Sequence, residues 1–249
     1  MPRVSPAVIL AAALASASPA MANVVVYIGN DPSATGDPLT SFPNATSALE
    51  SWSAALSGAP VFSGDLGALA VQSYPSGTSL AFNPGLSAIV TANTLSVRDV
   101  PGANGQYATL GATDNYFESY IGGAQFQFNE QVSGFSVFVT DLGDVSSETV
   151  TMTLLNDGNQ VASYQVTCGG SEETNCVPVG TGNGESGSVS FIGVTDTAGT
   201  FDTVVFTSTD SADAVGYDNI EVSAPEPASL AVLGSGLLAL AVLRRKRLG

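Results

Sequence analysis

The chain has 249 residues, enough for one domain on the usual scale of about 100–200 residues per domain, with further segments at its ends. Charged residues make up only 11% of it, and 22 acids stand against 6 bases. Arg98 is the only base between residues 23 and 224, where 21 of the acids lie, so this central body carries a net charge of −20. Such a charge repels phosphate backbones and excludes nucleic-acid binding. The absence of histidine excludes Ser-His-Asp and Cys-His catalysis, His-ligated zinc or haem, and a histidine pH switch.

The N-terminus has the three parts of a secretory leader. Arg3 provides a basic start, residues 7–17 are apolar but too few to span a bilayer, and Ala20-Met21-Ala22 is an A-x-A cleavage site. We therefore predict a signal peptide over residues 1–22, export through the Sec translocon and cleavage after Ala22. A buried N-terminal helix is the alternative, but a strand-like run begins directly after the A-x-A triplet.

One helix is predicted near the start of the body. Ser47 and Glu50 fit a capping box, in which a Ser hydroxyl and a Glu carboxylate satisfy exposed backbone N–H groups. Leu49, Trp52 and Leu56 recur at helical spacing and form one apolar stripe. We expect this stripe to dock on a sheet, which places the single tryptophan in the core rather than on an exposed glycan platform.

Alternation of apolar and polar residues with a period of two, interrupted by turn residues, indicates a series of short strands. Side chains alternate between the two faces of a strand, so each apolar set is expected on one sheet face. The sets are Phe126 with Phe128; Phe135 with Val137 and Val139; Val150 with Met152 and Leu154; Tyr164 with Val166; Val189 with Phe191; Val204 with Phe206; and Ile220 with Val222.

Turn signals between these sets favour antiparallel pairing. The Asn-Asp-Gly-Asn segment at 156–159 is predicted to form a hairpin turn, because Asp-Gly tolerates positive φ. Short strands with such turns predict an all-β fold, a single antiparallel β-sandwich of jelly-roll-like type over residues 23–223. No fixed period runs along the chain, which argues against a repeat solenoid.

The two cysteines, Cys168 and Cys176, bracket a polar loop of seven residues. In an exported protein this arrangement predicts a disulfide, worth roughly 2–3 kcal/mol on the chain-entropy model. A catalytic thiol is the alternative, but it needs a base and no histidine supplies one. A thiol titration of the exported protein is expected to find no free thiol.

The C-terminus combines a rigid motif, an apolar stretch and a basic end. Pro225-Glu226-Pro227 is followed by 16 uncharged residues and then by Arg244-Arg245-Lys246-Arg247. As a helix the uncharged stretch spans about 24 Å, short of a hydrocarbon core of about 30 Å. The basic cluster is expected to stop on the cytoplasmic side and leave the body outside. A simple single-pass anchor is the alternative, but it gives no reason for Pro-Glu-Pro.

Residues 224–249 resemble the PEP-CTERM sorting signal of exopolysaccharide-producing Gram-negative bacteria. The resemblance rests on Pro-Glu-Pro-Ala-Ser-Leu, the Leu/Gly/Ala span and the terminal Arg/Lys cluster, in that order. It implies recognition by an exosortase, a membrane cysteine protease-transpeptidase, and loss of the tail near Pro225–Pro227. Other removable hydrophobic anchors follow the same logic. The chain is then anchored in the membrane only transiently before it reaches the cell surface.

Parts of the body resemble segments common among proteins that carry this tail. These are residues 133–144, 191–196 and 215–222, in a pattern similar to lectin-like and carbohydrate-binding jelly rolls. In such modules an Asp of the last strand often binds a structural calcium, which the resemblance implies for Asp218. A fold of this type does not define an activity.

Several acids are candidate calcium ligands, because they fall at predicted strand ends or loops where oxygen ligands gather. We assign Asp141, Asp144 and Asp218 as the candidate set; Asp196, Asp210 and Asp213 occupy similar positions. None has the spacing of an EF-hand loop. The alternative is that these acids are solvated turn residues that form Asx-turn hydrogen bonds.

Three functions remain open from the sequence. The first is a non-enzymatic cell-surface or matrix protein of the exopolysaccharide or biofilm layer, without assigned catalytic residues. The second is a calcium-stabilised carbohydrate-binding module whose glycan face includes Tyr107, Tyr116, Phe117 and Tyr120, which are equally placed to be core residues. The third is an extracellular hydrolase with paired carboxylates, although no two acids are marked as converging in a cleft.

Overall fold

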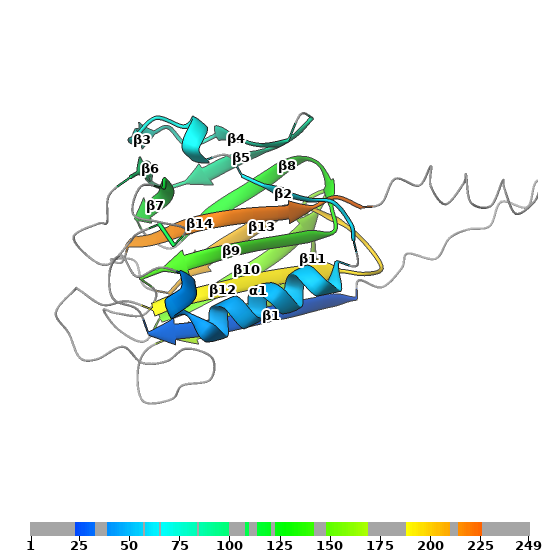
Figure 1. The fold of residues 1–249 in the computed structure, drawn as a ribbon. Helices are drawn as coiled ribbons and strands as arrows, with labels where there is room; N and C mark the ends of the chain where they lie inside the picture. The colour runs from blue at the N-terminus through cyan, green and yellow to red at the C-terminus, as the bar shows by residue number, and fades with distance from the viewer. Residues whose placement is uncertain are drawn as a thin grey trace, which may run out of the picture.

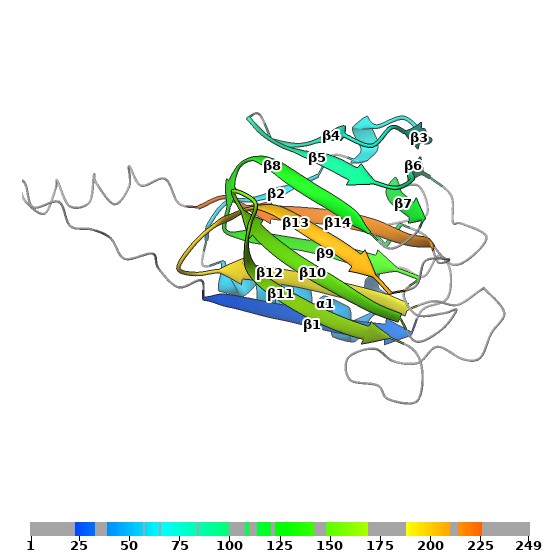
Figure 2. The same ribbon diagram turned by 180° about the vertical axis from the view of Figure 1, so that it is seen from behind.

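Two antiparallel sheets face each other and bury the apolar sides of their strands between them, which confirms the predicted β-sandwich (Figures 1 and 2). The computed structural model describes residues 23–32, 39–56, 58–64, 66–83, 85–99, 108–109, 114–120, 123–141, 148–168, 188–209 and 214–225. The leader, Cys176 and the chain from residue 226 onward lie outside these ranges.

Sheet A has eight strands. Its order is β1 (Val24–Pro32), β12 (Ser188–Asp196), β9 (Gly134–Thr140), β14 (Ala214–Ser223), β7 (Tyr116–Tyr120), β6 (Leu95–Arg98) and β3 (Gln72–Tyr74), and β2 (Val61–Ser63) also pairs with β14. Sheet B has six strands in the order β11 (Asn159–Cys168), β10 (Glu148–Asn156), β13 (Phe201–Ser208), β8 (Ala124–Val132), β5 (Leu86–Ala92) and β4 (Thr78–Asn83). Short 3₁₀ turns span Leu39–Ser41 (η1) and Leu66–Ala68 (η2).

The chain passes repeatedly from one sheet to the other, as expected for a jelly-roll-like sandwich. From β8 onward the strands β9, β12 and β14 join sheet A, whereas β10, β11 and β13 join sheet B. Between the sheets, the rings of Phe126, Phe135 and Phe206 pack with centroids 5.5 to 6.4 Å apart. Most of the predicted apolar sets line this core, so their period of two was interpreted correctly.

Strand β12 departs from the simple pattern because it is apolar on both faces. Ile192 and Val194 lie in the core between the sheets, whereas Val189 and Phe191 lie on the outer face, beneath a helix. The predicted set of Val189 and Phe191 is therefore a real strand face, but it packs on α1 rather than on the opposite sheet.

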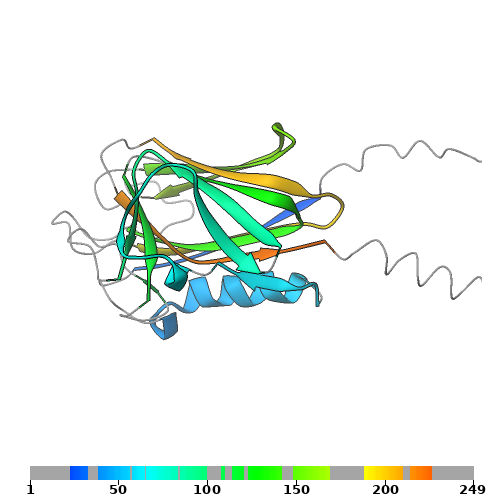
Figure 3. The ribbon, with the colours of Figure 1, turned by 90° about the horizontal axis from the view of Figure 1, so that it is seen from above.

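Helix α1 (Pro43–Ala55) covers the outer face of sheet A over β1 and β12 (Figures 1 and 3). Trp52 is fully buried, packs edge-on against Phe191 and donates a hydrogen bond from Nε1 to the carbonyl oxygen of Val194 at 2.9 Å. Leu49 and Leu56 pack around this cluster. The predicted apolar stripe and the core position of Trp52 are confirmed.

The predicted capping box is wrong, because the helix begins four residues before Ser47. The proline at position 43 starts it, where a missing N–H costs nothing. The exposed N–H groups are satisfied by Asp31 of β1, whose carboxylate accepts hydrogen bonds from the backbone N–H of Asn44 at 3.2 Å and of Ala45 at 2.8 Å. A carboxylate here also matches the positive end of the helix dipole. Ser47 instead lies exposed within the helix.

Strand β1 approaches α1 closely at a glycine. A Cβ atom at Gly29 would overlap the carbonyl oxygen of Asn44, so the two backbones meet without a side chain between them. At the opposite end of the sandwich, Asp157 and Gly158 join β10 to β11 with φ of 49° and 77°. A type I′ hairpin turn has positive φ at both of its central residues, so the predicted hairpin turn is confirmed.

Candidate functional sites

The two junctions of the body with its terminal segments lie at one end of sheet A. In the strand register, Val24 at the start of β1 is opposite Asp196, while Gly134 is opposite both Thr195 and Ser223 at the end of β14. Strands β12 and β9 lie between β1 and β14, so at a strand spacing of about 4.8 Å the two junctions are about 14 Å apart. We call this end of the molecule, defined by Asn23 and Pro225, the junction end.

A continuous series of hydrogen bonds crosses the junction end. The backbone N–H of Asn23 donates to Asp196 Oδ1 at 3.3 Å, and the backbone N–H of Asp196 donates to the carbonyl oxygen of Ser133 at 2.8 Å. The N–H of Ser133 in turn donates to the carbonyl oxygen of Ser223 at 2.8 Å. The first residue of the predicted mature chain and the last residue of β14 are thus linked through two intervening residues.

Asp196 is the buried carboxylate of this end, with only 4% of its surface exposed. Its Oδ1 also accepts hydrogen bonds from the N–H of Ala198 at 3.0 Å and of Gly199 at 2.8 Å. Its Oδ2 is buried and has no hydrogen-bond partner among the described residues. The hydroxyl of Tyr164 donates to the carbonyl oxygen of Val24 at 3.3 Å; burial, and then the negative charge of Asp196, raise the pKa of Tyr164.

The outer face of sheet B is the second candidate site, because no described helix lies over it (Figure 2). Register aligns its outward side chains in rows across the strands. One row contains Ser163, Thr153, Val205, Gln125 and Thr91, and the next contains Leu155, Thr203, Gln127, Ile89 and Ser79. A third, shorter row contains Gln165, Thr151 and Thr207. We call these three rows the hydroxyl–amide face.

The rows of the hydroxyl–amide face contain hydroxyl, amide and aliphatic side chains and no charged one. A carboxylate borders them at Asp202, which accepts a hydrogen bond from the buried Thr203 hydroxyl at 2.8 Å. The body as a whole carries a net charge of −20. The sequence indicated this face only indirectly, as the polar halves of the alternating strands. Only the strand register shows that side chains from residues 79 to 207 form continuous rows.

The described residues contain no group of three His, Cys, Asp or Glu side chains that could hold a metal ion, and they include two of the three predicted calcium ligands. Asp218 is buried on β14 and accepts hydrogen bonds from the N–H of Thr109 at 2.6 Å and from its hydroxyl at 2.8 Å. Asp141 is also buried, directly after β9, with φ of 67°. Register places Asp218 opposite Phe138, three residues before Asp141. Asp144 lies outside the described residues, so the calcium assignment stays a prediction.

Other buried acids hold the fold together. Glu118 forms an ion pair with Arg98, with Oε1 to Nη2 at 3.0 Å, and Asp31 binds the start of α1. Each of these carboxylates has a structural partner within the described residues.

Two of the four aromatic residues considered for a glycan face lie in the interior of the protein. Tyr116 and Phe117 belong to β7, which lies between β14 and β6 in sheet A, and both are fully buried. Tyr120 ends β7, and Tyr107 lies outside the described residues. The core interpretation of Tyr116 and Phe117 is therefore correct.

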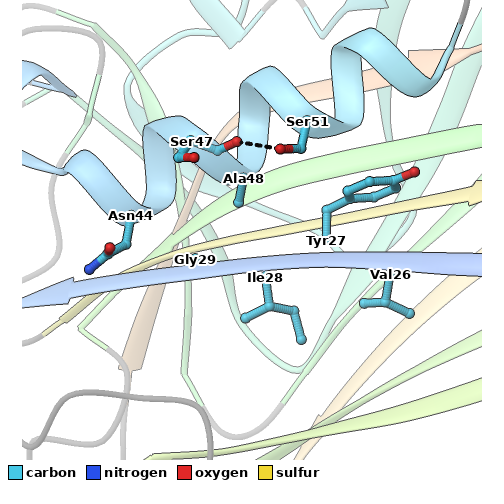
Figure 4. Close-up of a pocket in the computed structure, with 8 residues that line it drawn as sticks. All are labelled: Val26, Tyr27, Ile28, Gly29, Asn44, Ser47, Ala48 and Ser51. Atoms are coloured by element: carbon cyan, nitrogen blue, oxygen red, sulfur yellow. Dashed lines mark hydrogen bonds between the residues drawn. The ribbon is translucent and has the colours of Figure 1, made fainter.

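A shallow cleft of about 360 Å³ lies along the line where α1 packs against the edge strand β1 (Figure 4). Its polar lining includes the hydroxyl of Ser51, which donates to the carbonyl oxygen of Ser47 at 2.8 Å. The lining contains no charged side chain, and its residues are Val26, Tyr27, Ile28, Gly29, Asn44, Ser47, Ala48 and Ser51. The cleft thus lies where α1 docks on β1, and uncharged side chains line it.

The remaining predictions fall beyond the described residues. Cys168 ends β11, but Cys176 does not belong to these ranges, so the disulfide stays a prediction. The same holds for Ala20 and Ala22 of the cleavage site. In the described part of the chain, no helix has the length and apolarity to cross a membrane.

Residues 223–247 match the family model of the PEP-CTERM protein-sorting motif. The match begins at Ser223, the last residue of β14, so the sorting tail leaves the sandwich directly. The chain thus combines a β-sandwich body with the sorting signal of an exported protein that is held in the membrane before processing. A comparison with curated protein sequences found no match.

Among solved structures, the chain is similar to a mutant of the family 29 carbohydrate-binding module CBM29-2 in complex with mannohexaose. The identity is 13%, the alignment covers 66% of this chain and 92% of the module, and the TM-score is 0.32. A second mutant of that module gives a TM-score of 0.31 with the same identity and coverage. The enzymatically active domain of tailspike protein 4 of bacteriophage CBA120 aligns over 55% of this chain and 19% of its own, with 13% identity and a TM-score of 0.29.

Proposed function

We propose that this protein is an exported, non-enzymatic component of the exopolysaccharide or biofilm layer, sorted by an exosortase. The observation that carries the proposal is the sorting motif that begins at Ser223, where β14 ends. In this proposal the leader directs the chain to the Sec translocon, the body folds outside, and Arg244-Arg245-Lys246-Arg247 stays on the cytoplasmic side.

The junction end is the membrane-proximal end of the body in this proposal. Ser223 is fully buried, and Pro225 follows it after a single residue. Residues 225–227 can span at most about 10 Å even when fully extended, so the apolar stretch that begins at residue 228 starts close to the sandwich. An exosortase that acts at Pro225–Pro227 therefore meets its substrate next to a folded body.

Mass spectrometry of the protein from cells with and without the exosortase tests this function. We expect a shorter, surface-released form that has lost the hydrophobic tail near Pro225–Pro227 only when the exosortase is present. Replacement of Pro225 and Pro227 by alanine is expected to retain the full-length form in both strains. A full-length chain in both strains with the native motif would contradict the proposal.

Carbohydrate binding is a second candidate function, and the hydroxyl–amide face favours it. A neutral polysaccharide presents hydroxyl groups that donate and accept hydrogen bonds, as do Thr, Ser and Gln side chains. Away from Asp202, these uncharged rows avoid the desolvation cost of buried ions when a neutral chain binds. An acidic polymer is repelled by the net charge of the body unless divalent cations bridge the two.

Binding of neutral and acidic polysaccharides by the purified protein tests this candidate. Gln125→Glu places a charge at the centre of the face and is expected to weaken binding of a neutral polysaccharide about tenfold, or 1.4 kcal/mol. Gln72→Glu adds the same charge to an exposed position on β3 of sheet A and is expected to leave binding unchanged. Equal losses in the two variants would remove the face from consideration, and turnover of the polysaccharide would revive a hydrolase.

A further inference from the structure

A buried carboxylate oxygen without a partner lies at the point where the predicted leader joins the body. Asp196 is only 4% exposed, its Oδ2 has no hydrogen-bond partner among the described residues, and its Oδ1 lies 3.3 Å from the backbone nitrogen of Asn23. An unneutralised carboxylate in such a place is costly to the folded state. A cation close to both oxygens would remove this cost.

We propose that Asp196 is the binding site for the α-ammonium group that leader removal creates at Asn23. The inference rests on the proposed cleavage after Ala22. Hydrolysis of the Ala22–Asn23 peptide bond adds the hydroxyl of water to the Ala22 carbonyl carbon and leaves the nitrogen of Asn23 as a primary amine, which binds a proton at neutral pH.

The chemistry of the nitrogen changes in the way that Asp196 requires. Before cleavage, the nitrogen of Asn23 is a neutral amide with one N–H donor. After cleavage it carries a positive charge and three donors, so one can remain on Oδ1 while another reaches Oδ2. Charge-assisted hydrogen bonds of this kind are about twice as strong as neutral ones.

The pair acts on the strand that supports the helix. Val24 is opposite Asp196 in the β1–β12 pairing, so the ion pair holds the first residue of the edge strand β1. Farther along β1, Gly29 and Asp31 provide the contact surface and the cap of α1. A chain that keeps its leader lacks this pair, so its β1 and α1 are held less firmly than those of the mature protein.

Among the residues that the structure describes, the titratable groups next to the α-amino group are Asp196 of β12 and Tyr164 of β11. Tyr164 stays neutral near pH 8 because its pKa is raised. An ion pair with Asp196 raises the α-amino pKa of the folded state above its unfolded value of about 7.7–8.0. The stabilisation by the ion pair is therefore complete below the α-amino pKa of the unfolded state, and it is lost as the pH rises through the α-amino pKa of the folded state.

Acetylation of the α-amine tests the inference directly, because the only lysine of the chain is Lys246. Lys246→Arg leaves the α-amine as the sole primary amine of the full-length protein, purified in detergent from exporting cells that lack the exosortase. Acetylation is expected to lower the melting temperature by about 3–6 °C. In an Asp196→Asn background it is expected to change the melting temperature by less than about 1 °C.

Two further measurements keep the test decisive. Asp202→Asn alters a half-buried acid of β13 that binds the N–H of Asp157 at 2.8 Å, and the full effect of acetylation should persist in it. If Asp196→Asn does not fold, the wild-type pH profile decides: the melting temperature should fall between pH 7 and pH 9.5 in the free protein and stay level in the acetylated one.

The outcomes separate this inference from the proposed function. Equal acetylation effects with and without the Asp196 carboxylate, or identical pH profiles before and after acetylation, would overturn the ion pair. A mass-determined N-terminus other than Asn23 would refute cleavage after Ala22, and with it the inference. Neither result bears on exosortase processing, which is read from the C-terminus.

Discussion

Burial raises the pKa of Glu221 on β14, and a hydrogen bond from the hydroxyl of Ser63 to Oε1 at 3.3 Å opposes part of this rise. A carboxyl whose pKa is raised in the folded state binds more protons when folded. Its contribution to stability therefore falls as the pH rises from the pKa of the unfolded state through the pKa of the folded state. Glu221→Gln is therefore expected to raise the melting temperature by about 1–2 °C at pH 7. The gain should vanish near pH 3, and a gain that is constant with pH would contradict this explanation.

Trp52 combines complete burial with a hydrogen bond to a strand carbonyl. Trp52→Phe removes the donor that satisfies the Val194 oxygen and leaves part of the indole volume empty. We expect a loss of about 2–4 kcal/mol in the free energy of unfolding, measured by circular dichroism in urea. Ser51→Ala, at an exposed neighbouring position of α1, is the matched control and should cost much less.

At the scale of elements, the position of α1 depends on a residue that is not part of it. Asp31→Ala removes the acceptor of the Asn44 and Ala45 N–H groups and should destabilise the protein by about 2–3 kcal/mol in urea unfolding. Asp31→Asn keeps one acceptor and should lose less. Glu50→Gln removes an exposed acid of the same helix and is the control; a loss equal to that of Asp31→Ala would show that the two hydrogen bonds of Asp31 do not account for the effect.

Secondary structure was predictable wherever the local pattern decides it. The hairpin at Asp157-Gly158 and the apolar stripe of α1 follow from turn chemistry and helical periodicity. The start of α1 was not predictable in this way, because its N–H groups are satisfied by a carboxylate from β1. The outward direction of Val189 and Phe191 likewise depends on the helix that covers them.

At the scale of the whole molecule, the acidic surface should respond to ions. Raising NaCl from 10 to 150 mM shortens the Debye length from about 30 to 8 Å and should raise the melting temperature by weakening self-repulsion.

Calcium should act beyond this screening if Asp141, Asp144 and Asp218 bind it. CaCl₂ should then raise the melting temperature more than MgCl₂ does at equal ionic strength, and a chelator should remove the difference. Equal effects of the two divalent cations would exclude a calcium site.

The amino-acid sequence by itself determined the all-β class of the body, the core position of Trp52 and the nature of the C-terminal tail. These depend on periodicity and on contiguous motifs, which neighbouring residues define. The tertiary structure decided that Asn23 and Ser223 share one end of the sandwich, that Asp196 lies beside Asn23, and that the rows of the hydroxyl–amide face are continuous. Each of these depends on the register between strands that are distant in sequence, which is established only when the two sheets pack on a common core.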